Sequence, residues 1–339
     1  MGSDISTYLI AFAGTLLLAV IGTPLARKLG LRMNIMDQPE PGRRVHTVPT
    51  PRLGGVAIFV STITAAVLLR GVYSELGGIL IGATLMSFLG LWDDRRSLGA
   101  AVKLPLQLVS VGLVILSGVQ VTAFPYPVLN MALTVVWLLG ITNAINLLDN
   151  MDGLSAGVAA IAAAHFSIMC ALSGQYLVGA LSVAVVAACI GFLIYNWNPA
   201  TIFMGDSGTL FLGFMLASLG IKLRFPSNVS FVTWMIPPLV LGVPILDTTL
   251  VVISRLRRGL NPLTTPGTDH SSHRLTYAGL TRREAVLVLY VASFVLGLLA
   301  VFVTQATVAE GYLVGGLVSI CGAIALWRFE RLPFWPRRD

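Results

Sequence analysis

The sequence predicts an all-α, polytopic membrane protein with about eleven transmembrane helices. Of its 339 residues, 56% are hydrophobic and only 11% are charged, and the mean hydropathy is +0.85. Soluble domains usually carry about 25% charged residues, so this composition excludes an ordinary soluble protein. The apolar residues also occur in runs of roughly 20, the length that an α-helix needs to cross a bilayer.

Eleven apolar runs approach this length, and they follow one another along the whole chain. We therefore predict a single integral membrane domain. The approximate limits of the runs are residues 5–26, 53–70, 76–92, 102–118, 128–146, 154–172, 175–195, 207–223, 230–254, 284–304 and 309–327.

The basic residues predict the orientation of these helices. If the N-terminus lies outside and successive runs alternate in direction, all but three of the 22 lysines and arginines fall on the inner side. The exceptions are Arg70, Lys222 and Arg224. Positive charge accumulates in cytoplasmic loops, so we expect an outer N-terminus and a cytoplasmic C-terminus in the inner (plasma) membrane. The net charge of +7 follows from this rule and does not indicate a nucleic-acid partner.

Acidic and amide side chains gather at the inner ends of the apolar runs. The members of this group are Asn143, Asn146, Asp149, Asp152, Asp93, Asp94 and Asp206. Ionisable groups beside hydrocarbon are costly and tend to mark functional sites. Mg²⁺ commonly takes one or two carboxylates together with substrate phosphates. The pattern therefore favours a Mg²⁺ site at the inner membrane surface, with plain solvation of helix ends as the alternative.

The predicted site is assembled from cytoplasmic loops, at about residues 27–52, 93–103, 146–154, 196–207 and 255–283. The longest of them contains His270, His273 and Arg274. Neutral imidazole suits Zn²⁺ better than Mg²⁺, so we interpret this group as donors to phosphate. A basic patch against anionic membrane lipid is the alternative. Neither a P-loop nor a Rossmann glycine motif is present.

The ninth apolar run contains two helix-breaking residues, Gly242 and Pro244, followed by Asp247. A break here would open a lipid-facing groove beside Asp247. The alternative is a packing kink in which Asp247 pairs with an arginine of the inner loop. His165 lies deep in another run, and we expect it to be a hydrogen-bonded structural residue.

Five segments, in this order, resemble the motifs of the polyprenyl-phosphate N-acetylhexosamine-1-phosphate transferases of glycosyltransferase family 4. The segments are His46 to Gly55, Asp93-Asp94 with Lys103, Asn143 to Leu154, Phe203 to Leu210, and His270 to Arg274. The resemblance covers about residues 27–290. The chain departs from the family pattern at Ser97, Asn150 and Ser272, where an aspartate, a glycine and a histidine are usual.

The resemblance implies roles for particular residues. Asp206 and Asn146 would hold Mg²⁺, with Mn²⁺ as a substitute, and Asp93, Asp94 and Asp206 would be catalytic. The implied substrate-binding residues are Arg52, Lys103, Asn143, Asp149, Asp152, Phe203, His270, His273 and Arg274. Phe203 would stack on uracil, and the basic residues would bind phosphates.

The implied reaction transfers N-acetylhexosamine-1-phosphate, in the first instance GlcNAc-1-phosphate, from a UDP-sugar to undecaprenyl phosphate and releases UMP. It would be the first membrane step of a cell-envelope polysaccharide such as O-antigen or teichoic acid. Two alternatives remain: a phospho-MurNAc-pentapeptide translocase, and a flippase or transporter of lipid-linked sugars. We also leave a homodimer open.

Overall fold

The computed structural model describes residues 2–38, 49–69, 74–226, 228–262, 264–265 and 267–332. This part of the chain is predominantly helical, and its two strands, β1 (Met36–Asp37) and β2 (Thr50–Pro51), form one short antiparallel pair. The helices are α1 (Gly2–Arg32), α2 (Gly54–Leu68), α3 (Ser74–Arg96), α4 (Ala100–Leu116), α5 (Pro127–Leu148), α6 (Leu154–Leu172), α7 (Tyr176–Asn196), α8 (Asp206–Lys222), α9 (Ser230–Thr233), α10 (Ile236–Val240), α11 (Gly242–Arg257), α12 (Ser271–Tyr277), α13 (Arg282–Val303) and α14 (Val308–Arg331). The predicted all-α class is confirmed.

Each predicted span overlaps a helix or a bent pair of helices. Among the described residues, seven helices are long and apolar enough to cross a membrane: α1, α3, α5, α6, α7, α13 and α14. The segment Ser230–Val240 and α11 form an eighth candidate, bent by 71°. The other predicted spans fall on the shorter helices α2, α4 and α8, with 15, 17 and 17 residues. The chain is a multi-pass membrane protein, and the count of eleven stays a prediction.

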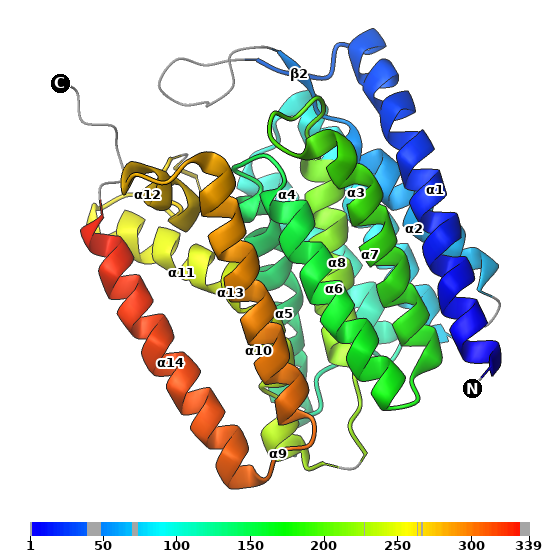
Figure 1. The fold of residues 1–339 in the computed structure, drawn as a ribbon, viewed down its shortest axis with the longest axis vertical. Coiled ribbons are helices and arrows are strands. Elements are labelled where there is room, and N and C mark those ends of the chain that lie inside the picture. Colours follow the sequence, from blue (N-terminus) through cyan, green and yellow to red (C-terminus); the bar gives the residue numbers. More distant parts are fainter. Residues whose placement is uncertain are drawn as a thin grey trace.

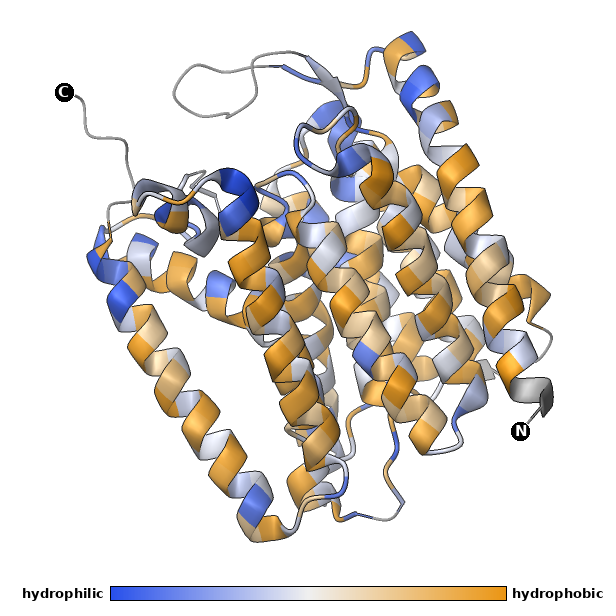
Figure 2. Ribbon diagram, viewed as in Figure 1, coloured by the Kyte–Doolittle hydropathy of each residue, from blue (hydrophilic) through white to orange (hydrophobic). Residues whose placement is uncertain are grey.

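Hydrophobic residues form a belt around the bundle. Figure 2 shows apolar residues along the middle of the helices and hydrophilic ones toward their ends. Large apolar side chains such as Leu17, Val136 and Leu317 are more than half exposed, as expected of surfaces that meet lipid. The start of α1 and the end of α14 lie at opposite ends of the bundle (Figure 1). Which end faces the cytoplasm stays a prediction.

Helix α8 lies at the centre of the bundle and positions the site. All its residues from Ser207 to Ile221 are buried, and it packs against α3, α5, α2 and α6. A helix that is apolar all round is expected to be enclosed by others. Its first residue, Asp206, is thereby fixed where several helices end. Deeper in the bundle, His165 Nδ1 lies 2.8 Å from the carbonyl oxygen of Ile161, so its structural assignment is confirmed.

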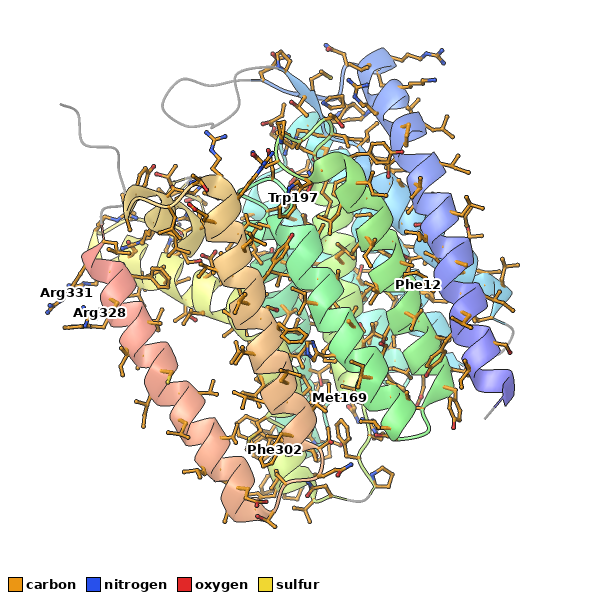
Figure 3. The ribbon with its side chains drawn as sticks, viewed as in Figure 1. Phe12, Met169, Trp197, Phe302, Arg328 and Arg331 are labelled. Carbon is orange, nitrogen blue, oxygen red and sulfur yellow. The ribbon has the colours of Figure 1, made fainter. Side chains whose placement is uncertain are left out.

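The break expected near Gly242 and Pro244 is present, because α10 ends at Val240 and α11 departs at 71°. Figure 1 shows α11 leading across the bundle toward α12, and α14 leaning away from α13. Of α14 only Gly311 is buried. Arg328 and Arg331 project outward at its end (Figure 3), and the Arg331 guanidinium lies 3.8 Å from the centre of the Trp327 ring.

Candidate active site

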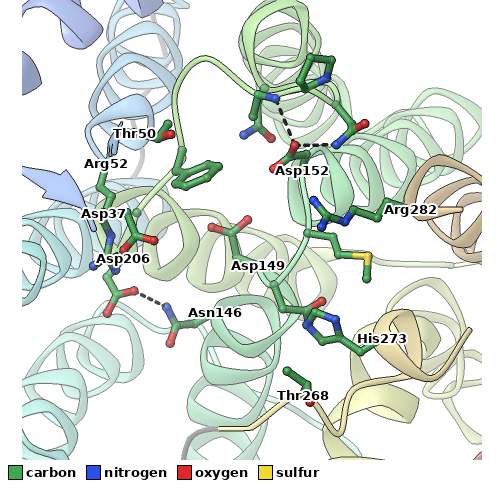
Figure 4. Close-up of a pocket in the computed structure, with 18 of the residues that line it drawn as sticks. Asp37, Thr50, Arg52, Asn146, Asp149, Asp152, Asp206, Thr268, His273 and Arg282 are labelled. Atoms are coloured by element: carbon green, nitrogen blue, oxygen red, sulfur yellow. Dashed lines mark hydrogen bonds and ion pairs between the residues drawn. The ribbon is translucent and has the colours of Figure 1, made fainter. Parts of the chain in front are cut away.

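A cavity of about 620 Å³ lies where α5, α8, α12 and α13 meet the two strands (Figure 4). Its volume lies within the range of about 300–1,000 Å³ that is typical of small-molecule sites. Its lining residues are Asp37, Thr50, Arg52, Asn146, Asp149, Asn150, Met151, Asp152, Asn196, Asn198, Pro199, Ala200, Phe203, Gly205, Asp206, Gly267, Thr268, His273 and Arg282. Four of the five predicted loops contribute to this set, and the loop at 93–103 lies behind it.

Asp94 fixes the start of α8. Its two carboxylate oxygens accept the backbone N–H groups of Asp206 and Ser207, at 3.0 and 3.1 Å. The preceding Gly205 has a φ of +73°, and a Cβ there would lie 2.4 Å from the carbonyl oxygen of Arg52. Only glycine permits this conformation and this close approach. The Asp94 side chain is 0% exposed and positions Asp206, and its predicted catalytic role stays a prediction.

Lys103 and Asp93 also hold Asp206 from behind. The Lys103 Nζ lies 2.9 Å from Asp206 Oδ2 and forms a second ion pair with Asp93. Asp93 in turn accepts the backbone N–H of Leu98. Neither Lys103 nor Asp93 lines the cavity. Here the two residues form a network that keeps Asp206 charged and oriented, and the predicted phosphate contact of Lys103 and catalytic role of Asp93 stay predictions.

Asn146 and Asp206, 60 residues apart in sequence, are adjacent at the cavity wall. The Asn146 amide donates from Nδ2 to Asp206 Oδ1 at 3.0 Å and to Thr209 Oγ1 at 2.7 Å. Figure 4 shows the first of these bonds beside Asp149. The two residues predicted as metal ligands are thus brought together by the packing of α5 against α8.

Asp149, just after α5, lines the cavity, and its carboxylate forms no hydrogen bond with another described residue. Burial, followed by the negative charge of Asp206, raises the pKa of Asp149 to about 7. The nearby Arg52 opposes this shift, but its guanidinium already pairs with Asp37 at 3.2 Å and Asp94 at 3.5 Å. A buried carboxylate is stabilised either by a cation or by a proton. The Asp149 carboxylate is therefore a group that a bound cation would stabilise.

Asp152 shapes another part of the wall. Its Oδ2 accepts Asn198 Nδ2 at 2.9 Å and the backbone N–H of Ala200 at 3.1 Å (Figure 4). These bonds fix the loop that leads to Phe203. The backbone of Phe203 is bonded to Gly54 and Pro51, which places its side chain in the cavity lining.

Helix α12 is anchored by Asp247 on α11. One oxygen of Asp247 lies 2.8 Å from His270 Nδ1, and the other accepts the backbone N–H and the hydroxyl of Ser271 at 2.7 and 2.6 Å. His270 is 4% exposed and does not line the cavity, and its predicted phosphate contact stays a prediction. Asp247 pairs with the imidazole of His270. The sequence had suggested either a lipid-facing groove beside Asp247 or a pair with an arginine of the inner loop.

His273 is the histidine that lines the cavity. Burial, together with the nearby His270, lowers the pKa of His273 to about 4. The ring is therefore neutral at pH 7 and presents one donor and one acceptor nitrogen rather than a charge.

Two further predicted residues, Arg274 and Asn143, form hydrogen bonds with other residues of the protein. Arg274 is 0% exposed and donates to the carbonyl oxygens of Asp269 and Phe329, to Ser254 Oγ and to Glu330. Asn143 exchanges hydrogen bonds with Gln107 between α5 and α4. Neither residue lines the cavity, and both predicted substrate contacts stay predictions.

Sequence reasoning did not select several lining residues. Arg282 is the most informative, because it supplies a cation on the side opposite Arg52 (Figure 4). Thr281 and Glu284 form a capping box at the start of α13, which fixes Arg282 in the first turn. The spacing of Thr281 and Glu284 was the sequence signal that could have drawn attention to Arg282. The first predicted motif is described only from Pro49 onward, so His46 lies outside the described residues.

The lining residues fit a divalent cation shared with a phosphate ligand. Among those described, the cavity has four carboxylates, from Asp37, Asp149, Asp152 and Asp206, against the guanidinium groups of Arg52 and Arg282. No group of three His, Cys, Asp or Glu side chains in the described chain is placed to hold a metal alone. Mg²⁺ does not need one, since it is commonly held by one or two carboxylates with substrate phosphates and water.

Fold and cavity together define a class: an integral membrane enzyme with a polar, mainly acidic site at the ends of its helices. A model of "Glycosyl transferase family 4" matches residues 76–224. The chain is 39% identical over 310 residues to a protein of Bacillus subtilis strain 168 named probable undecaprenyl-phosphate N-acetylglucosaminyl 1-phosphate transferase, with 88% of this chain and 86% of the relative covered.

More distant relatives agree. A decaprenyl-phosphate N-acetylglucosaminephosphotransferase of Mycolicibacterium smegmatis is 31% identical, with 81% of this chain and 76% of the relative covered. A phospho-N-acetylmuramoyl-pentapeptide-transferase of Bacillus cytotoxicus is 32% identical, with 63% of this chain and 74% of the relative covered. This chain belongs to glycosyl transferase family 4, and it is a phosphotransferase of that family's type.

Proposed function

We propose that this protein transfers GlcNAc-1-phosphate from UDP-GlcNAc to undecaprenyl phosphate, giving the lipid diphosphosugar and UMP at the cytoplasmic face of the membrane. The names of the relatives support a sugar phosphate as the group transferred and a polyprenyl phosphate as the acceptor. The observation that carries the proposal is the cavity. There the Asp149 carboxylate, which has no hydrogen bond with another described residue, faces Asp206, and two arginines lie nearby. We place the reaction at the start of a cell-envelope polysaccharide pathway.

A divalent cation follows from charge. A diphosphate would meet more carboxylates than guanidinium groups in this cavity, and the excess would repel it. Asp206, Asn146 and Asp149 would hold Mg²⁺, which would neutralise charge on the diphosphate and on the leaving UMP. Arg52 and Arg282 would donate to the phosphate oxygens, and Phe203 would stack on uracil.

The chemical step requires positioning more than a base. An oxygen of the lipid phosphate forms a bond to the sugar-linked phosphorus, and the bond from that phosphorus to the UMP phosphate breaks. A phosphate monoester has a second pKa near 6, so the acceptor is largely a dianion at pH 7. Asp93 therefore has no proton that it must remove. We assign it the role of holding Lys103, and through it Asp206.

The acceptor's tail must remain in hydrocarbon while its phosphate reaches the cavity. The break before α11 turns this helix by 71° from the preceding segment, Ser230–Val240. We propose that the break gives the lipid lateral access. A flippase would in addition need polar groups near the membrane midplane.

UMP release tests the proposal directly. Purified protein in detergent with undecaprenyl phosphate, UDP-GlcNAc and Mg²⁺ should release UMP, and removing the metal with EDTA should abolish release until Mg²⁺ or Mn²⁺ is restored. UDP-GalNAc and UDP-MurNAc-pentapeptide serve as competing donors. Faster turnover of the pentapeptide donor would favour the alternative named by the Bacillus cytotoxicus relative. The absence of release with every donor would refute the transferase reaction.

The neutral state of His273 predicts which substitution it tolerates. His273→Gln retains a neutral donor and acceptor, whereas His273→Ala retains neither, so the alanine variant should have a kcat/KM about 3- to 10-fold below that of the glutamine variant. The ratio should stay constant between pH 6 and pH 8, because the pKa near 4 lies below this range. If the two variants were equal, or if the ratio followed a titration near pH 6.5, the neutral role would be wrong.

A further inference from the structure

One hydrogen bond joins the two walls of the cavity. The hydroxyl of Ser272, on α12, donates to Asn150 Oδ1, on the loop after α5. The Asn150 amide in turn donates from Nδ2 to the carbonyl oxygen of Leu147 at 3.1 Å, within the last turn of α5. Ser272 is 0% exposed, so its hydroxyl has no competing water. The amide of Asn150 is therefore held at both ends, between α5 and α12.

The other hydrogen bonds that anchor α12 in the described chain lie on its far side. Ser271 and His270 bond to Asp247 on α11, and Arg274 bonds to Ser254, Asp269 and the end of α14. Within the described chain, the Ser272–Asn150 bond is the one hydrogen bond between α12 and the loop at residues 149–152. This bond is therefore the polar contact that sets the position of α12 relative to the acidic wall.

The groups flanking this bond are the ones that face the ligand. Asn150 directly follows Asp149, and Ser272 directly precedes His273; both flanking residues line the cavity, and their side chains form no hydrogen bond with another described residue. Asp149 is a carboxylate and His273 is a neutral ring, so neither attracts the other strongly enough to fix their spacing. The hydrogen bond between the adjacent residues, Ser272 and Asn150, can fix the spacing that the side chains of Asp149 and His273 do not fix themselves.

We infer that Asn150 and Ser272 form a single positioning unit, which sets the spacing of Asp149 and His273 and thereby the affinity for the sugar nucleotide. These are two of the three positions where the sequence departs from the pattern of the family it resembles, and in the fold the two departures contact each other. The inference rests on the proposed function for the identity of the ligand. It does not require that transfer be fast.

A double-mutant cycle tests the unit. Asn150→Ala and Ser272→Ala should each weaken UDP-GlcNAc binding about 3- to 10-fold, and the double variant should be no weaker than the worse single variant. Ser272→Cys, nearly the same size but a weaker donor, should show the same direction with less risk to folding. The matched control is Ser271→Ala, the neighbouring serine that bonds to Asp247, whose effect should multiply with that of Asn150→Ala.

The measurements are the equilibrium Kd of UDP-GlcNAc with Mg²⁺ and without lipid acceptor, and the kinetic constants of UMP release. The KM for UDP-GlcNAc should rise while kcat and the KM for undecaprenyl phosphate stay within about 2-fold, a split that general loss of structure would not produce. Independent, multiplying effects of Asn150→Ala and Ser272→Ala would overturn the unit. Coupling in Kd without UMP release would support the unit and overturn the proposed reaction.

Discussion

Replacing Asp206 by asparagine should lower kcat/KM for UMP release by about 100- to 1,000-fold. Loss of one group that stabilises transition-state charge typically costs this much. Asp206 faces the cavity at the start of α8, and three residues are arranged around it: Asp94 at its backbone, Lys103 at one oxygen and Asn146 at the other. Several residues that hold and orient a single carboxylate are expected where its charge must be placed accurately.

Two variants separate this chemical effect from unfolding. Asp94→Asn, which removes the carboxylate that caps α8, should lower the melting temperature as well as activity, because buried N–H groups at a helix start lose a charged acceptor. Glu310→Gln, in the capping box of α14 at the far end of the bundle, should leave UMP release unchanged. If Asp206→Asn retained activity within about 10-fold, its assignment as the central ligand would have to be abandoned.

Replacing Asp149 by asparagine should abolish the pH dependence of Mg²⁺-supported UDP-GlcNAc binding. The pKa of Asp149 is raised to about 7 by burial and then by Asp206, so the group is mostly protonated at pH 6 and mostly ionised at pH 8. A cation binds the ionised form, so the apparent Mg²⁺ affinity of the wild-type protein should rise about 10-fold over this interval. In Asp149→Asn it should be weaker and flat.

The binding measurement must omit undecaprenyl phosphate, since the second pKa of a phosphate monoester, near 6, would add its own titration. Asp152→Asn is the matched control: it also removes a cavity carboxylate, but one that is committed to Asn198 and Ala200. This control should retain the rise with pH. A pH-independent Mg²⁺ affinity in the wild-type protein would show that Asp149 does not contact the cation.

The free energy of unfolding of the metal-free protein should fall as the pH rises, whereas the Mg²⁺ affinity should increase. The folded-state pKa of Asp149 lies above the ordinary aspartate value of 3.8, so folding favours the protonated form of this group. Its ionisation thus costs stability as the pH rises through about 7, and Mg²⁺ should offset that cost. Thermal unfolding with and without Mg²⁺ at pH 6 and pH 8 gives this comparison.

Composition and periodicity were sufficient for the class of fold. Long apolar runs must form helices in a bilayer, because no water is present there to satisfy the backbone, and the eleven predicted spans all overlap helices. The break before α11 followed from Gly242 and Pro244. Each of these signals is local, which is why one sequence suffices to see it.

The division of labour among the polar residues depended on the tertiary structure. A sequence shows that Asp93, Asp94, Asp149 and Asp206 lie at helix ends, but it does not show which neighbour each one meets. Asp94 meets the start of α8, Lys103 lies between Asp93 and Asp206, and Asp149 meets no donor. The same holds for the histidines, since Asp247 engages His270 and leaves His273 at the cavity.

By itself, then, the sequence determined a multi-pass helical protein whose acids and amides gather at one end of its helices. Hydropathy and local breaking signals act within one segment, so they can be read along the chain. Only the packing of α5, α8 and α12 decided that Asp206 and Asp149 face the same cavity and that Asn150 bonds to Ser272. Those pairs are 57 and 122 residues apart in sequence, and distances across such separations are set by how whole helices pack.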